Sequence, residues 1–232
     1  DYAVRLDTIK GANADKTPLI ESDKLQKKTF KYQDVEYTIY ILHAREGAGE
    51  QPKFSDSTFV TYKGELLNGT RFDGSNTPVW FDAVMTIPGF GQGLSEFKGA
   101  TGFEINDDNT ITWENDFGVG TLFIPSGLAY FSTPRPTIPA YSPLIFSIQM
   151  FAVNEADHDG DGIPSYLEDL NGDQILDNDD TDGDFTPNFM DADDDGDFTP
   201  TRDEIEILED GTLILTDTNE DGTPDYLDKS TY

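Results

Sequence analysis

Five acidic segments toward the C-terminus place carboxylate and amide side chains at a fixed spacing. These frames are DHDGDGIPSYLE from residue 157, DLNGDQILDNDD from 169, DTDGDFTPNFMD from 180, DDDGDFTPTRDE from 193 and DTNEDGTPDYLD from 217. Each frame has Asp or Asn at positions 1, 3 and 5 and an acid at position 12, and most have Gly at position 4 and Pro at position 8. A hard cation such as calcium takes oxygen ligands that a loop supplies from those side chains and from the carbonyl at position 7. The spacing therefore predicts a row of calcium-binding loops.

The predicted metal ligands occupy positions 1, 3, 5, 7 and 12 of the five frames. They are Asp157, Asp159, Asp161, Ile163, Glu168, Asp169, Asn171, Asp173, Ile175, Asp180, Asp182, Asp184, Thr186, Asp191, Asp193, Asp195, Asp197, Thr199, Glu204, Asp217, Asn219, Asp221, Thr223 and Asp228. In the first frame Ser165 is expected to add an oxygen directly or through water. Because Asp180 ends the second frame and begins the third, its carboxylate is expected to bridge two ions.

An acidic, disordered and solubilising tail is the alternative interpretation, since residues 155–232 hold 27 acidic and two basic residues. Disorder does not require a fixed Gly, a fixed Pro or an apolar pair before the closing acid. An EF-hand is disfavoured because the loops follow one another without intervening helices. The segment resembles the calcium-binding thrombospondin type 3 repeats, which bacterial surface proteins also carry, although the Cys residues of the animal repeats are missing. The resemblance implies structural calcium, and the mutual repulsion of the carboxylates predicts that the tail folds only with calcium.

Composition excludes several classes of function. The chain has 232 residues and a net charge of −31, which would repel a phosphate backbone, so nucleic acid is not expected as a partner. It has no Cys and therefore no disulfide or thiolate chemistry. No run of apolar residues reaches the ~18 needed for a transmembrane segment, and DYAVRLDTIK at the start lacks the apolar core of a signal peptide.

The chain divides into three predicted parts. Residues 1–35 are polar and are expected to form an N-terminal extension, residues 36–154 a sheet-rich domain, and residues 155–232 the acidic repeats. Short alternating runs such as EYTIYIL (36–42) and STFVTY (57–62) are typical of strands. Two hairpins are also expected, one in the 205–216 interval around Asp-Gly and one in residues 101–118.

The sheet-rich part carries four ordered motifs: TYKGELLNGTRFDGSN from 61, TIPGFGQGL (86–94), TLFIPSGLAYF (121–131) and TIPAYSPLIFSIQMF (137–151). In these blocks residues 36–153 resemble the FKBP-type peptidyl-prolyl cis-trans isomerases. The resemblance implies an α+β fold, an antiparallel sheet wrapped around a short helix, with a loop-rich calcium-binding repeat region after it. It also identifies residues 101–118 as an insertion relative to that family.

Carried over block by block, the resemblance implies a proline pocket. Its residues would be Tyr62, Phe72, Asp73, Phe81, Ile87, Phe90, Tyr130, Ile138 and Phe146. Phe90 would form the floor, Ile87 would offer its backbone N–H and Tyr130 its hydroxyl, while Asp73 would order its neighbours. The sequence departs from the family pattern with Phe90 for Trp, Thr86 for Val, Val79 for Phe, Thr137 for Ile and Phe131 for Gly. Val79 and Thr137 are expected to thin the apolar wall most.

These features predict a peptidyl-prolyl isomerase and folding chaperone that acts on Xaa-Pro bonds of exported polypeptides. Catalysis would need no cofactor, calcium would be structural, and the thinned wall would lower activity. The alternatives are a non-catalytic module that binds proline segments or proteins, and a surface component that keeps the fold only as a scaffold. Weak calcium sites suit millimolar calcium, which favours the periplasm or the bacterial cell surface. A start at Asp1 fits a chain trimmed of an export signal and is compatible with a lipid anchor upstream.

Overall fold

A computed structural model describes residues 4–231, which form two compact units that divide between Asn154 and Glu155. The first unit is built on a six-stranded sheet with the order β1-β2-β7-β8-β3-β4, in which neighbouring strands are antiparallel. The strands are β1 Leu25–Tyr32, β2 Val35–Arg45, β3 Ser57–Leu66, β4 Arg71–Asp82, β7 Gly118–Ile124 and β8 Leu144–Asn154. Three 3₁₀ turns accompany the sheet: η1 Gly11–Asn13, η2 Leu19–Glu21 and η3 Ser126–Leu128.

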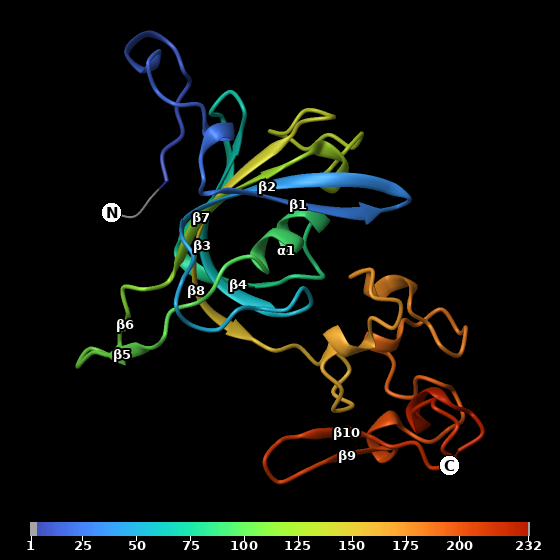
Figure 1. Cartoon of the computed structure of the whole chain (residues 1–232). Helices are drawn as coiled ribbons and strands as arrows, with labels where there is room; N and C mark the ends of the chain where they lie inside the picture. The colour runs from blue at the N-terminus through green and yellow to red at the C-terminus, as the bar shows by residue number, and fades with distance from the viewer. Residues whose placement is uncertain (1–3, 232) are drawn as a thin grey trace. The chain divides into compact units, whose positions relative to one another are not determined.

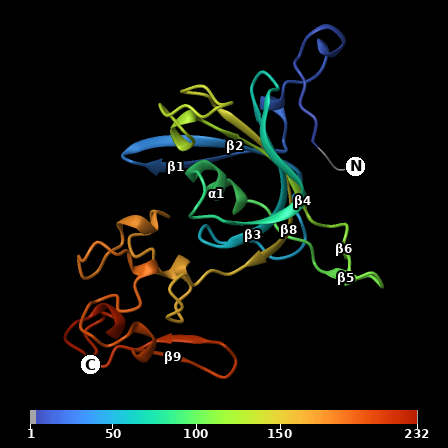
Figure 2. The ribbon, with the colours of Figure 1, turned by 180° about the vertical axis from the view of Figure 1, so that it is seen from behind.

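One short helix, α1 (Pro88–Leu94), packs on the concave face of this sheet, as both views of the ribbon show (Figures 1 and 2). The helical sequence PGFGQGL is rich in glycine, which alone would disfavour a helix. Close packing explains the composition, because a Cβ on Gly93 would lie 2.5 Å from Leu122 of β7, and one on Gly91 would lie 2.4 Å from the Ala83 carbonyl oxygen. The first unit therefore has the predicted α+β architecture of an antiparallel sheet around a short helix.

The predicted N-terminal extension is wrong at its C-terminal boundary, because residues 25–32 form the edge strand β1, paired with β2 along its length. Lys28, a charged residue on the inward-facing side of β1, interrupts the alternation of apolar and polar residues that would indicate a strand. The Lys28 ammonium donates to the Gln92 carbonyl oxygen (3.2 Å) and to Ser95 Oγ (3.1 Å), and it forms an ion pair with Glu96 (2.9 Å). A lysine on the inner face thus binds the C-terminal end of α1, where cations are favoured.

The insertion at residues 101–118 forms the expected hairpin, with β5 Phe103–Ile105 paired to β6 Ile111–Trp113. Trp113 anchors it: its ring centroid lies 5.6 Å from that of Phe151 and 6.0 Å from that of Phe59. Ile105 and Ile111 are exposed. The hairpin extends away from the six-stranded sheet (Figure 1).

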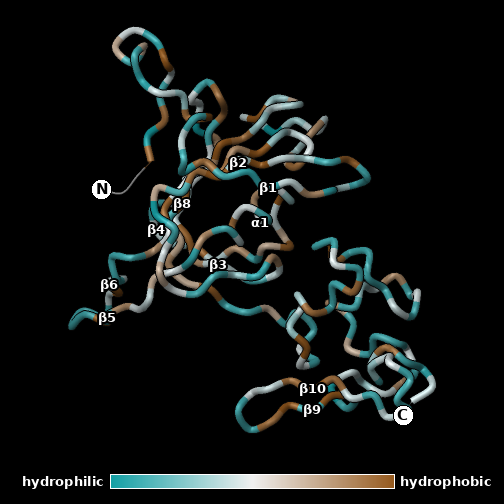
Figure 3. The backbone as a smooth tube through the Cα atoms, in the orientation of Figure 1, coloured by the Kyte–Doolittle hydropathy of each residue, from teal (hydrophilic) through white to brown (hydrophobic). Residues whose placement is uncertain are grey.

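The second unit is a chain of loops with short turns. Its elements are η4 Ser165–Glu168, η5 Leu176–Asn178, η6 Asn188–Met190, η7 Thr201–Asp203, β9 Ile205–Ile207, β10 Leu213–Leu215 and η8 Asp225–Leu227. Strands β9 and β10 form the hairpin expected in the 205–216 interval. Much of this unit is hydrophilic (Figure 3), and its buried apolar side chains are few: Ala156, Ile163, Leu176, Phe189 and Tyr226. Within residues 4–231, no helix has the length and apolar character to cross a membrane.

Replacing Gly91 by Ala tests the packing of α1. Helix propensity alone would make this change stabilising by about 1 kcal/mol. We expect it instead to lower the free energy of unfolding by roughly 1–3 kcal/mol, because the new Cβ meets the Ala83 carbonyl oxygen. Urea unfolding followed by tryptophan fluorescence reports on the first unit, which holds both Trp residues. Gly102→Ala is the matched control, since a Cβ at Gly102 would have no atom within 4 Å. A stabilised Gly91→Ala protein would contradict the packing.

Candidate functional site

A cavity of about 770 Å³ opens in the first unit beside α1, and all nine residues of the predicted proline pocket line it. Tyr62 comes from β3, Phe72, Asp73 and Phe81 from β4, Ile87 and Phe90 from the start of α1, Tyr130 from the segment after η3, Ile138 from the following loop and Phe146 from β8. The sequence therefore brings together, from six parts of the chain, the residues that the resemblance singles out. Their roles remain predictions.

Phe90 lies at the centre of the aromatic side chains of this cavity and is 3% exposed. Its ring centroid lies 4.7 Å from that of Phe146, 5.4 Å from that of Phe81 and 6.3 Å from that of Tyr62. Edge-to-face contacts such as the 82° arrangement with Phe81 are favourable for aromatic pairs. This buried, central position fits the predicted role of Phe90 as the floor of the pocket.

Gly64 of β3 makes room for the wall of the cavity. A Cβ there would lie 2.5 Å from the ring of Phe72 and 3.2 Å from that of Phe146. These two rings pack edge to face with centroids 5.4 Å apart. The pairing of Tyr62 with Gly64 therefore has a steric reason. Tyr62 lines the cavity, and the missing side chain of Gly64 leaves room for the rings of Phe72 and Phe146.

Tyr62 and Asp73 form a polar pair at the cavity. The Tyr62 hydroxyl is hydrogen-bonded to the Asp73 carboxylate, and burial together with this contact raises the pKa of Tyr62 to about 12. Asp73 also accepts a hydrogen bond from the Gly74 N–H at 2.7 Å. Tyr62 therefore stays protonated at neutral pH, and its contact with Asp73 is compatible with the ordering role predicted for Asp73.

Two groups could hold the carbonyl oxygens of a bound peptide. Ile87 is the N-cap residue of α1, and its carbonyl accepts from the Phe90 N–H at 2.9 Å. Among the backbone hydrogen bonds of turns, loops and caps within residues 4–231, none has the Ile87 N–H as its donor. Tyr130 is half-buried, and the Arg135 guanidinium lies 4.7 Å from its ring centroid.

The departures from the family pattern differ in whether they line the cavity. Val79 lies in β4 opposite Val60 and does not line the cavity, and neither does Phe131, which is exposed and packs against Tyr141. Thr86 and Thr137 do line it, and the Thr86 hydroxyl is bonded to the Ala83 carbonyl at 2.8 Å. That Val79 does not reach the cavity fits the prediction that it thins the wall, which stays a prediction. Sequence reasoning missed three lining residues, Met85, Arg135 and Pro136, which lie in segments that connect helices and strands.

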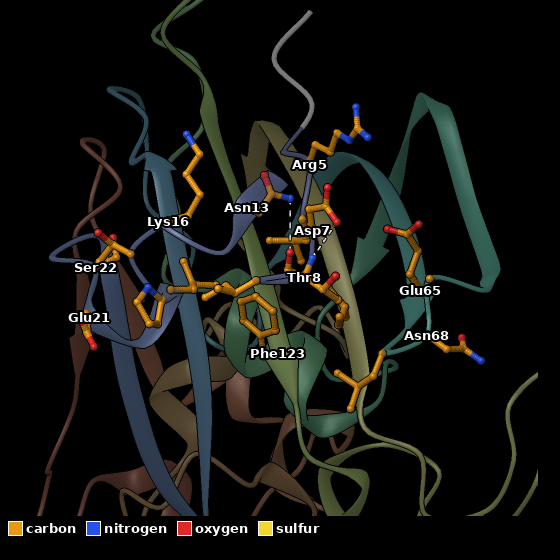
Figure 4. Close-up of a pocket in the computed structure, with 18 of the residues that line it drawn as sticks. Arg5, Asp7, Thr8, Asn13, Lys16, Glu21, Ser22, Glu65, Asn68 and Phe123 are labelled. Atoms are coloured by element: carbon orange, nitrogen blue, oxygen red, sulfur yellow. Dashed lines mark hydrogen bonds between the residues drawn. The ribbon is translucent and has the colours of Figure 1, made fainter. Parts of the chain in front are cut away.

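A second cavity of about 990 Å³ lies between the N-terminal segment, residues 5–23, and parts of β3, β7 and β8 (Figure 4). Phe123 of β7 lies among its lining side chains, and Arg5 and Lys16 are on the N-terminal segment. Local bonds shape that segment: the Thr8 N–H donates to Asp7 Oδ1 at 2.8 Å, and Asn13 Nδ2 donates to the Thr8 carbonyl at 3.3 Å. This cavity shares no residue with the predicted pocket.

The five acidic frames of the second unit share one loop geometry. In each, the carboxylate at position 1 accepts from the N–H at position 6, and the side chain at position 5 accepts from the N–H at position 7. The residue at position 6 has a positive φ in every frame; these residues are Gly162, Gln174, Phe185, Phe198 and Gly222. The repeat is therefore a repeat of structure, which a disordered tail would not show.

Carboxylate oxygens converge inside these loops. Four clusters of acidic side chains each have ligand atoms within 4.8 Å of one another: Asp157, Asp159 and Asp161; Asp161, Glu168 and Asp194; Asp180, Asp182 and Asp184; and Asp193, Asp195 and Asp197. Several buried oxygens lack a hydrogen-bond partner, among them both of Glu168 and one each of Asp159, Asp161, Asp179, Asp194, Asp195, Asp197 and Glu204. Such groups are costly unless a cation or a proton neutralises them.

The pKa values of these carboxyl groups reflect that cost. Burial, with the charges of Asp159 and Asp194 adding to it, raises the pKa of Glu168 to about 10. Burial likewise raises the pKa of Asp194 and of Glu204 to about 8. The loops thus bring carboxylate oxygens together and offer no nitrogen or sulfur ligand in these clusters. Such a group of ligands fits a hard cation such as calcium.

Two details of the predicted ligand set differ in the structure. Ser165 is not directed to a metal, because its hydroxyl accepts from the His158 N–H (3.2 Å) and contacts His158 Nδ1 (2.8 Å). The second frame closes with Asp179 instead of Asp180: Asp179 is 6% exposed, and the charges of Asp169 and Asp173 help raise its pKa. This frame lacks the Pro at position 8 and is one residue shorter, so Asp180 opens the third loop.

Comparison with known proteins separates the two units. Over 140 residues the chain is 32% identical to the FKBP-type peptidyl-prolyl cis-trans isomerase FkpA of Buchnera aphidicola, covering 58% of this chain and 49% of that protein. It is 31% identical over 116 residues to the outer membrane protein MIP of Legionella longbeachae, covering 47% and 42%. Over these lengths the chain is similar to FKBP-type peptidyl-prolyl isomerases. The chain spans about half the length of these relatives.

Among solved structures, that of FkpA from Escherichia coli is similar with a TM-score of 0.44 and 28% identity, covering 58% of this chain and 53% of that one. In the second unit, a family model described as BamM C-terminal matches residues 158–214. This match overlaps the first four frames and the hairpin β9–β10. The thrombospondin type 3 resemblance stays a prediction.

Phe198→Gly tests the shared loop geometry. Phe198 is 94% exposed and has φ of 78°, a left-handed conformation that costs a non-glycine residue about 1–2 kcal/mol. After allowance for the greater freedom of unfolded Gly, we expect the variant to stabilise the fourth loop by about 0.5–1 kcal/mol. Slower hydrogen exchange of the amides of residues 193–204 would register this. Phe189→Gly, at a buried position, should speed exchange nearby. Faster exchange in Phe198→Gly would contradict the loop geometry.

Proposed function

We propose that the first unit catalyses the cis-trans isomerisation of Xaa-Pro bonds in exported polypeptides and so assists their folding. One observation carries this proposal: the nine residues implied by the family resemblance line a single cavity with an aromatic floor. The similarity of the chain to FKBP-type isomerases supports the same activity.

The chemistry needs a shaped environment instead of an acid, a base or a nucleophile. The barrier to rotation about the peptide bond is about 20 kcal/mol because twisting breaks amide resonance. A twisted amide loses charge separation, so a cavity lined by Phe72, Phe90 and Phe146 disfavours the planar ground state while it accepts the proline ring. The Ile87 N–H and the Tyr130 hydroxyl would hold the flanking carbonyl oxygens, which supplies orientation.

A non-catalytic binding module is the competing function. This alternative rests on the departures from the family pattern at Val79, Thr137 and Phe131. Of these three residues only Thr137 lines the cavity. The wall is otherwise formed by aromatic and aliphatic side chains in mutual contact. The rate of peptide relaxation distinguishes the two functions.

For the second unit we propose structural calcium binding. The ligands would be the side chains at positions 1, 3 and 5, the carbonyl at position 7 and the closing acid of each frame, with Asp179 closing the second. Support comes from the convergent carboxylates and from their unpartnered buried oxygens. Calcium would supply the positive charge that holds these loops closed.

Loops of this kind with dissociation constants of about 10⁻⁴–10⁻³ M would be filled only where calcium is millimolar. We therefore place the protein outside the bacterial cytosol, in the periplasm or at the cell surface. The Legionella relative is named as an outer membrane protein, which is consistent with this placement.

The isomerase proposal predicts that the full chain accelerates the relaxation of a short Phe-Pro or Leu-Pro peptide. Tyr130→Phe should lower kcat/KM about tenfold by removing one hydrogen bond, and adding Phe146→Ala should abolish acceleration. Phe131→Ala is the matched control, an aromatic neighbour outside the cavity, and should keep the wild-type rate. A folded wild-type protein that binds the peptide without accelerating it would establish the binding module.

The calcium proposal predicts that the second unit unfolds when the metal is removed. With a chelator, we expect the radius of gyration of the full chain to increase and far-UV circular dichroism to change, because the repulsion of crowded carboxylates is no longer offset. Tryptophan fluorescence should stay unchanged, since both Trp residues lie in the first unit. A radius of gyration and a spectrum that are the same with and without calcium would refute the proposal.

A further inference from the structure

Asp161, Glu168 and Asp194 form a buried cluster that joins two separate frames. Asp161 and Glu168 belong to the first frame, whereas Asp194 belongs to the fourth. One ligand oxygen from each lies within 4.8 Å of the others. All three are almost fully buried, with exposed fractions of 2%, 0% and 2%.

The free oxygens of this cluster lack partners. Asp161 Oδ2, Asp194 Oδ1 and both oxygens of Glu168 are buried without a hydrogen bond. Burial raises the pKa of the Asp161 carboxyl group, and the positive charge of Arg202 only partly offsets this effect. Three buried carboxyl groups that face one another without a counter-charge are strongly unfavourable. Something outside the described protein atoms must neutralise them.

Asp194 is held so that one of its oxygens remains available. Its Oδ2 accepts a hydrogen bond from the Thr201 hydroxyl at 2.7 Å, and its N–H donates to the same hydroxyl oxygen at 3.1 Å. The corresponding position 2 in the other frames is His158, Leu170, Thr181 or Thr218. Asp194 is therefore the one carboxylate at position 2, a position that the repeat pattern assigns to no metal.

We propose that Asp161, Glu168 and Asp194 bind one calcium ion together, so that a cation links the first frame to the fourth. The inference rests on the proposed calcium binding of the second unit and adds a ligand from outside the loop. The donor set contains only carboxylate oxygens, which suits a hard cation and excludes one that needs nitrogen or sulfur ligands. Tyr226 of the fifth frame is 2% exposed, and burial, together with the charges of these three carboxyl groups, raises the pKa of its hydroxyl.

Calcium binding by the full-length chain tests the proposal. Equilibrium dialysis against calcium compares the wild type with Asp194→Asn and with Asp203→Asn, a matched change of charge at an exposed position in the same frame. We expect Asp194→Asn to lose one bound ion or to weaken it at least tenfold, and Asp203→Asn to match the wild type. Equal binding by all three proteins overturns the inference but leaves calcium binding intact. A wild type that binds no calcium at millimolar concentration refutes the proposed function itself.

Hydrogen exchange in calcium gives a second readout that separates lost ligation from misfolding. In Asp194→Asn we expect the amides of residues 157–168 to lose their calcium-dependent protection, although the substitution lies in the fourth frame. The frames at 169–179 and 217–228 should stay protected. Unchanged protection of residues 157–168, or a loss spread equally over all five frames, overturns the link.

Discussion

The close approach of α1 to the sheet is the constraint on which the candidate site depends. Three glycines let this short helix approach its neighbours more closely than a side chain would permit: Gly89 faces Ile124, Gly91 faces the Ala83 carbonyl, and Gly93 faces Leu122. That approach places Phe90 among Tyr62, Phe81 and Phe146, and it positions the Ile87 N–H at the edge of the same cavity. On the opposite side, Lys28 of β1 binds the C-terminal end of the helix.

The second unit follows a different physical principle. It buries few apolar side chains, and its backbone is organised by carboxylates that accept hydrogen bonds from N–H groups within each loop. Carboxyl groups such as Glu168 and Glu204 are buried with oxygens unpartnered. Hydrophobic burial stabilises the first unit without a ligand, whereas the second gathers negative charge that only a bound cation or protons can offset.

Patterns carried by local spacing could be predicted from the sequence, and contacts between distant segments could not. The nine residues that the family resemblance implies are all among the fourteen that line the cavity, and the frame spacing found the loops with their side chains at positions 1, 3 and 5. Strand β1 was missed because Lys28 on its inner face conceals the alternation, and its partner Glu96 is far along the chain. The sequence pattern did not point to Asp179 because the second frame lacks the Pro of the other four frames and is one residue shorter. It did not point to Asp194 because the carboxylates beside Asp194 come from another frame.

The most direct test of the central claim is to map where a proline peptide binds to the isotope-labelled full chain by NMR, in calcium. The account predicts that the largest amide shifts fall on Ile87, Phe90 and Tyr130, and that the cis and trans signals of the peptide exchange faster with catalytic amounts of protein. Shifts centred on the N-terminal cavity around Thr8 and Phe123, with no faster exchange, would contradict it.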